Sequence, residues 1–174
     1  MAQGHEGQRV VLIALDGSET ADNAFNWYLK EMRQPNDYVY GIIVPEFSFS
    51  GVSVISMAIK LVGPLADVNA LSAEFQNQYQ VVEQLCANYT AKLRSAGVKG
   101  QVDSMSGDKP GPTICEQAAK LKASCIVMGT RGHSGLKKLI LGSVSNYVLH
   151  HAGVPCSVIP LKQKAEEESQ GQKK

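Results

Sequence analysis

The sequence predicts a single α/β domain in which a doubly wound, five-stranded parallel sheet carries helices on both faces. Short, nearly continuous apolar runs alternate along the chain with longer segments whose apolar residues recur at helical spacing. Such strand–helix alternation favours a parallel sheet covered on both sides. The 174 residues, of which 44% are hydrophobic, are typical of one domain with a sizeable core.

Five segments are predicted to be strands. The runs RVVLIAL at Arg9–Leu15 and YVYGIIV at Tyr38–Val44 are almost entirely apolar, as expected of strands that are buried on both faces. Val98–Ser104 alternates between polar and apolar residues and predicts a weaker strand. The shorter runs Ser124–Met128 and Cys156–Pro160 complete the sheet.

Helical spacing fills the first two long gaps between these strands. Ser18 is predicted to cap a helix whose apolar residues begin at Ala21. A long amphipathic helix is predicted from Leu71 until Gly97 ends it. Its apolar stripe would suit a two-helix coiled coil, but packing on a sheet explains it more simply.

Two further helices are predicted in the second half of the chain. Pro112 and Thr113 are expected to open the first of them. The second is expected to start near Ser143, to place Val144, Tyr147 and Val148 on one face and to stop at Gly153.

The domain is predicted to span residues 9–161. Residues 1–8 and 162–174 are polar with little apolar surface to bury, so both ends are predicted to be disordered. The connection Pro45–Ala70 is long for a simple loop, which predicts local structure or a functional loop there.

The charge balance, the apolar pattern and the cysteines limit the classes of partner, the localisation and the metal sites that we expect. The 17 basic and 16 acidic residues give a formal net charge of +1, which provides no reason to expect nucleic acid or an anionic membrane. The most apolar region, Val52–Val68, is broken by Lys60 and Pro64 and is shorter than the roughly 20 residues that span a bilayer. No secretory signal or close cysteine pair is present. We therefore expect a cytoplasmic protein without a zinc site.

A spaced glycine motif predicts a phosphate site. Gly129 follows a predicted buried strand, Gly132 comes three residues later, and Gly142 with Ser143 opens the last predicted helix. Ligands of doubly wound sheets bind at the carboxyl ends of the strands, and a helix N-terminus favours phosphate. Ser143 and Ser145 add hydroxyl groups there. The first glycine pair alone would be common by chance, and the chain has no P-loop motif.

Asp16 lies where the first predicted strand ends and its helix begins. An aspartate in such a place commonly forms a turn or caps a helix. It can also accept a hydrogen bond from a ribose hydroxyl or an adenine amine. Both roles are compatible.

The motif G-2x-G-9x-G-[ST], complete from Gly129 to Ser143, resembles that of the ATP-binding universal stress proteins. The opening VVLIALDGSETADNA, the segment GDKPGPTI and the closing LGSVSNYVLHHAGVPCSVIP are also similar to that family, so the resemblance covers Arg9–Pro160. It implies the strand order 3-2-1-4-5 and a dimer that pairs through the last strand, Val154–Pro160. It also implies ATP, AMP or ADP as ligand, with ATP bound together with magnesium.

The resemblance implies a role for most of the predicted site. Asp16 is expected near adenosine, the backbone of Ile43 and Val44 beside adenine, and Met128 with the first glycines beside ribose and phosphates. Arg131 lies inside the motif, where facing phosphate and facing solvent are equally compatible with the sequence. The complete predicted set is Ala14, Asp16, Ile43, Val44, Met128, Gly129, Arg131, Gly132, Gly142, Ser143, Val144 and Ser145.

These features predict a nucleotide-dependent sensor or signalling module of the stress response. The alternative is a slow magnesium-dependent ATP hydrolase that uses the same pocket. A third class, an interaction protein with an unused pocket, does not explain the intact glycine motif. No catalytic residue and no protein-held metal ion are predicted.

Overall fold

The computed structural model describes residues 7–45, 68–107, 109–130 and 141–161. The predicted disordered ends, apart from Gly7 and Gln8, and most of the connection Pro45–Ala70 therefore lie outside the described residues. The elements in chain order are β1 (Arg9–Leu15), α1 (Glu19–Trp27), the π-helical turn η1 (Tyr28–Met32), β2 (Asp37–Ile43), α3 (Val68–Ser95), β3 (Lys99–Ser104), α4 (Pro110–Lys120), β4 (Cys125–Gly129), α5 (Ser143–His151) and β5 (Cys156–Ile159).

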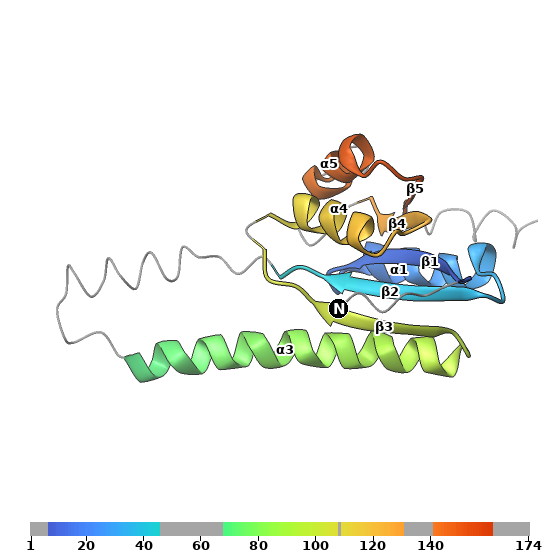
Figure 1. Cartoon of the computed structure of the whole chain (residues 1–174). Coiled ribbons are helices and arrows are strands. Elements are labelled where there is room, and N and C mark those ends of the chain that lie inside the picture. Colours follow the sequence, from blue (N-terminus) through green and yellow to red (C-terminus); the bar gives the residue numbers. More distant parts are fainter. Residues whose placement is uncertain (1–6, 46–67, 108, 131–140, 162–174) are drawn as a thin grey trace, which may run out of the picture.

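The five strands form one sheet in the order β3-β2-β1-β4-β5 (Figure 1), and every neighbouring pair is parallel. This confirms the predicted fold class and strand order. Beside β1, Arg9 pairs with Asp37 of β2 and Val11 with Cys125 of β4. The chain leaves β1 toward β2 and β3 and then crosses to β4 on the other side, so the strand order reverses between β1 and β4.

Helices cover both faces of the sheet and bury a separate core on each. The first core joins residues of α1 and α3, among them Phe25 and Tyr89, to one face of the strands. The second joins residues of α4 and α5, among them Ile114 and Val148, to the other face. From Val10 to Leu15, successive residues of β1 alternate between the two cores, which explains why this strand is apolar on both sides.

Local signals end the helices where the sequence predicts. The Ser18 hydroxyl accepts a hydrogen bond from the Ala21 N–H at 3.2 Å and caps α1. Gly97 and Gly153 follow α3 and α5 with φ of +63° and +65°, a conformation that glycine adopts without strain.

Several predicted boundaries are wrong by a few residues. The long helix begins at Val68 rather than Leu71, and α4 begins at Pro110 rather than Pro112. The first N–H groups of a helix have no partner within it, so a proline, which lacks an N–H, fits the first turn at either position. Packing decides between the two prolines. The third strand begins at Lys99 and not at Val98.

Other differences concern the predicted site and the last helix. The fourth strand runs to Gly129, which is therefore its last residue and does not follow it. β2 ends at Ile43 and β5 at Ile159, each one residue early. Of the three residues predicted on one face of α5, Val148 is fully buried, whereas Tyr147 is 36% exposed. The ring of Tyr147 packs across Gly111 of α4, where a Cβ would come within 2.7 Å of it.

Candidate functional site

A cavity of about 650 Å³ lies at the carboxyl edge of the sheet. It opens where the strand order reverses between β1 and β4, which is where doubly wound sheets bind their ligands. Its walls come from both helical layers. The lining residues are Ala14, Leu15, Asp16, Ala21, Ile42, Ile43, Val44, Pro45, Val81, Val82, Leu85, Pro110, Ile114, Met128, Gly129, Gly142, Ser143, Val144 and Ser145.

Every predicted site residue that the structure describes lines this cavity. They come from the ends of β1, β2 and β4 and from the start of α5, and are Ala14, Asp16, Ile43, Val44, Met128, Gly129, Gly142, Ser143, Val144 and Ser145. Arg131 and Gly132 lie outside the described residues, so their predicted role stays a prediction.

The start of α5 is tied to the end of β4. The Gly142 N–H donates to the Thr130 carbonyl at 2.8 Å, and the buried Ser145 hydroxyl donates to the Gly129 carbonyl at 2.9 Å. α5 begins at Ser143, and the first N–H groups of a helix have no partner within it. These bonds therefore hold a helix N-terminus, with its partial positive charge, at the cavity wall.

Gly129 is required by packing. A Cβ on this residue would lie 2.8 Å from the backbone carbonyl carbon and oxygen of Thr20 in α1. Real side chains do not approach backbone so closely, so the absence of a side chain lets α1 pack against the end of β4. The close approach of α1 therefore explains the glycine at position 129 without reference to a ligand.

Asp16 has the turn-forming role that its position predicts. Its Oδ1 accepts a hydrogen bond from the Ser18 N–H at 2.9 Å, across Gly17, whose φ is +78°. Among the described lining residues Asp16 carries the only charge. A carboxylate at this edge can accept hydrogen bonds from hydroxyl or amine groups or contact a cation.

Metal-binding clusters and membrane-spanning helices are both absent from the described residues. Within them, no three His, Cys, Asp or Glu side chains are grouped so as to hold a metal ion. No helix in this part of the chain has the length and apolar character needed to cross a membrane.

A sequence model of the universal stress protein family matches residues 8–160. The chain belongs to this family. Universal stress protein Slr1101 of Synechocystis sp. is 37% identical to it over 97 residues, which are 53% of this chain and 89% of that protein.

Solved universal stress proteins share the fold. The Arabidopsis thaliana family protein with AMP bound has a TM-score of 0.57 and 18% identity, and the match covers 91% of this chain and 94% of that one. A universal stress protein in complex with cAMP has a TM-score of 0.56 and 16% identity, with 88% and 97% covered.

In this universal stress protein the cavity also has walls that the sequence did not predict. Val81, Val82 and Leu85 come from α3, and Pro110 and Ile114 from α4. Val82, Leu85 and Ile114 belong to apolar stripes at helical spacing, and a residue in such a stripe is expected to lie in the core. Only the packing of the helices on the sheet distinguishes a side chain that faces a cavity from one that faces the core.

Proposed function

We propose that this chain binds an adenine nucleotide in the cavity between β1 and β4 and acts as a nucleotide-dependent sensor or signalling module of the stress response. The observation that carries the proposal is that every described residue of the predicted nucleotide set lines one cavity. The relatives that contain AMP and cAMP support the same class of ligand.

The distribution of polar and apolar groups fits a nucleotide. One end of the cavity has the N-terminus of α5 with Gly142 and Ser143, which suits phosphate. Aliphatic side chains from β2 and the helices, such as Ile43 and Val44, supply apolar surface for a base. Binding sites of this size commonly combine apolar walls with a few polar groups that fix orientation.

ATP with magnesium is the proposed ligand, and AMP and ADP share its adenosine contacts. The phosphates would lie against Ser143, Val144 and Ser145, and adenosine near Asp16. The Ser145 hydroxyl already donates to Gly129, so Ser143, which is exposed, is the residue whose hydroxyl would donate to phosphate. Magnesium would neutralise part of the phosphate charge without a protein ligand among the described residues.

Calorimetric titration with ATP and magnesium tests the proposal on the natural chain and on a Gly142→Val, Ser143→Glu double variant. Gly142 has φ −63° and ψ 155°, which any residue adopts, so the variant should fold. The introduced bulk and negative charge should abolish micromolar binding. The control is Asn146→Glu, which adds the same charge to an exposed position of α5 outside the cavity lining. Equal binding by all three proteins would refute the site.

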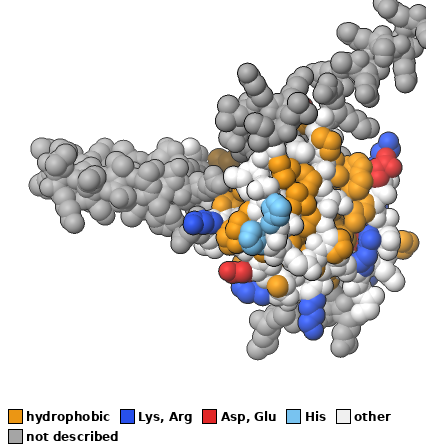
Figure 2. All heavy atoms as spheres, turned by 90° about the horizontal axis from the view of Figure 1, so that it is seen from above, with side chains coloured by type: hydrophobic (Ala, Val, Ile, Leu, Met, Phe, Trp, Pro, Cys, Tyr) orange, Lys and Arg blue, Asp and Glu red, His pale blue; other side chains and the backbone are white. Residues whose placement is uncertain are grey.

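We further propose that two copies pair through the last strand, in the region Val154–Pro160. β5 is an edge of the described sheet and pairs with β4 alone. Figure 2 shows hydrophobic side chains gathered around the described histidines on the face above α5. Tyr147 and Leu149 of α5 and Leu161 after β5 are 36%, 44% and 38% exposed. An apolar surface beside an open strand edge supports an interface.

A further inference from the structure

We infer that α3 clamps the base of the bound nucleotide through Leu85 and Val82, and that nucleotide binding thereby stabilises the docking of α3 on the sheet. This inference rests on the proposed function and adds a recognition element outside the glycine motif. It assigns to α3 a role that its apolar pattern alone does not indicate.

The first observation is that the cavity lies between the two helical layers. Val82 and Leu85 pack with the core of α1 and α3, whereas Ile114 and Val144 pack with the core of α4 and α5. All four side chains line the same cavity. A planar base that fills its apolar part therefore contacts aliphatic side chains from both faces of the sheet.

The second observation connects Leu85 to the strand end that carries Asp16. A Cβ on Gly17 would lie 3.1 Å from Leu85 Cδ2, so this leucine rests directly on the turn after β1. Gly17 has φ +78°, and its missing side chain leaves the space that Leu85 occupies. Leu85 thus covers the adenosine end of the proposed site from the side opposite α4.

The third observation is that, among the described side chains of α3, those that line the cavity are less buried than the core side chains farther along the helix. Val81 lines the cavity but is 62% exposed, and Val82 and Leu85 are only half-buried. Tyr89 and Leu93, farther along the helix, are 1% exposed. Figure 1 shows that α3 extends past the carboxyl ends of the strands. A ligand that buries Val82 and Leu85 would therefore stabilise this half of the helix most.

The test compares AMP affinity in matched variants of α3. Leu85→Ala should weaken AMP binding about tenfold because it removes apolar contact with the base. Val82→Thr keeps the side-chain shape but replaces one methyl group of the apolar wall with a hydroxyl, and should weaken binding severalfold. Cys86→Ala alters the adjacent residue, which lines a separate open groove with Tyr79 and Glu83, and Leu93→Ala removes core packing remote from the cavity. Both controls should change affinity less than about twofold.

Hydrogen exchange provides the second readout. Saturating AMP should slow amide exchange in residues 81–89 of the natural chain, and this protection should be smaller in Leu85→Ala. Equal losses of affinity in Leu85→Ala and Leu93→Ala would show that α3 acts only through stability and would overturn the inference. Unchanged exchange in α3 at saturation would also overturn it. If the natural chain binds ATP with magnesium but not AMP, the same comparison is made with ATP. Failure to bind either nucleotide would instead refute the proposed function, and the inference with it.

Discussion

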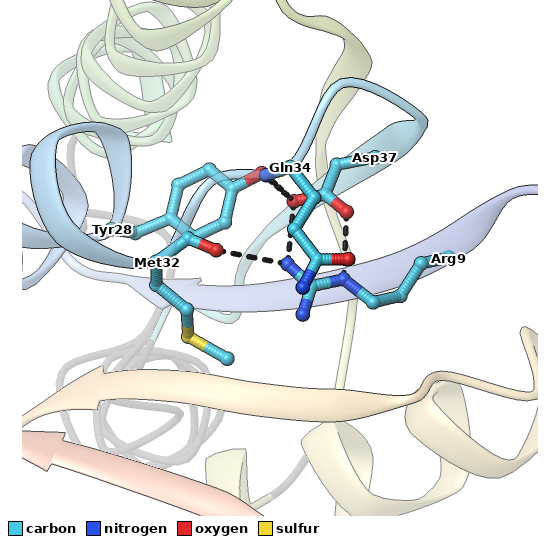
Figure 3. A network of polar contacts seen from close by, with 5 residues as sticks. All are labelled: Arg9, Tyr28, Met32, Gln34 and Asp37. Carbon is cyan, nitrogen blue, oxygen red and sulfur yellow. Dashed lines mark hydrogen bonds and ion pairs between the residues drawn. The ribbon is translucent and has the colours of Figure 1, made fainter.

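Arg9 and Asp37, the first residues of β1 and β2, form a bidentate ion pair. Arg9 Nε lies 2.7 Å from Oδ1 of Asp37 and Nη2 lies 2.7 Å from Oδ2, and the two residues are register partners in the sheet. Tyr28 Oη and the Gln34 N–H also donate to Oδ2, and Arg9 Nη2 donates to the Met32 carbonyl (Figure 3). This network fastens the π-helical turn η1 to the amino edge of the sheet.

Replacing Asp37 with Asn should destabilise the fold by about 3 kcal/mol, because it leaves the Arg9 charge without its partner. The Asp37 side chain is only 1% exposed and that of Arg9 is 26% exposed, so water can replace only part of the lost contacts. Urea unfolding measures the change. The control is Glu31→Gln, which breaks the exposed pair with Lys30 and should cost less than about 1 kcal/mol. Equal losses in the two variants would contradict a special role for the buried pair.

Stability should fall when the solution is acidified. Burial raises the pKa of Asp37, but hydrogen bonds from Arg9, the Gln34 N–H and Tyr28 outweigh burial and lower the pKa below its ordinary value. A carboxylate whose pKa is lowered by folding stabilises the folded state fully at pH values above its pKa in the unfolded chain, which is about 3.9. This stabilisation is lost as the pH falls through the pKa of the folded state.

Urea midpoints measured from neutral pH down through this range check the expectation. The natural chain should lose stability steeply below about pH 4, and Asp37→Asn should lose less because it has no such carboxylate to protonate. Parallel curves for the two proteins would show that other carboxylates, such as Asp22, whose pKa is also lowered, dominate the acid response.

Gly129→Ala should destabilise the ligand-free protein by about 1–3 kcal/mol, because the new Cβ would overlap the Thr20 backbone. Thermal or urea unfolding without nucleotide measures this. Ser124→Ala, at the exposed residue just before β4, should change stability by less than about 0.5 kcal/mol. If Gly129→Ala is as stable as the natural chain, α1 can move to accept the new Cβ. Packing would then not require the glycine, and only the close approach of a ligand would.

Val158→Pro should prevent the proposed pairing through β5. The carbonyl of Pro155 accepts from Ile126 of β4, and that of Ile159 accepts from Thr130, just after β4. By alternation along the strand, the N–H of Val158 therefore points away from β4, to the edge at which a second copy would pair. Proline removes that N–H without breaking the ladder to β4. Val158→Thr keeps the N–H and the side-chain shape. Sedimentation velocity should show a dimer for the natural chain and Val158→Thr, and a monomer for Val158→Pro. A dimer in all three would place the interface elsewhere.

The sequence predicted the fold because its signals are local. The apolar runs of Arg9–Leu15 and the following strands, the cap at Ser18 and the glycines that end α3 and α5 each depend on neighbouring residues. The resemblance to universal stress proteins supplied the strand order, which local pattern does not contain. The π-helical turn at Tyr28–Met32 was not predicted. Its two end residues form hydrogen bonds with Arg9 and Asp37, and the sequence of the turn does not indicate these contacts.

The candidate site was also predicted only in part, for the same reason. The glycine motif and Asp16 identified the carboxyl ends of β1 and β4 and the start of α5, because a strand end followed by glycine or aspartate is visible in sequence. The wall from Val82 and Leu85 was not visible, since about seventy residues separate these side chains from Asp16 and their spacing is that of any core-facing helix.

By itself, the sequence determined the alternation of strands and helices, the cap at Ser18 and the strand ends and helix start that line the cavity, because each depends on side-chain chemistry within a few positions. The tertiary structure alone decided that Gly129 is small to admit Thr20, that the Ser145 hydroxyl holds the end of β4, and that α3 closes one side of the cavity. These features arise from packing between segments distant in the chain, and local chemistry does not specify which distant surface a side chain will meet.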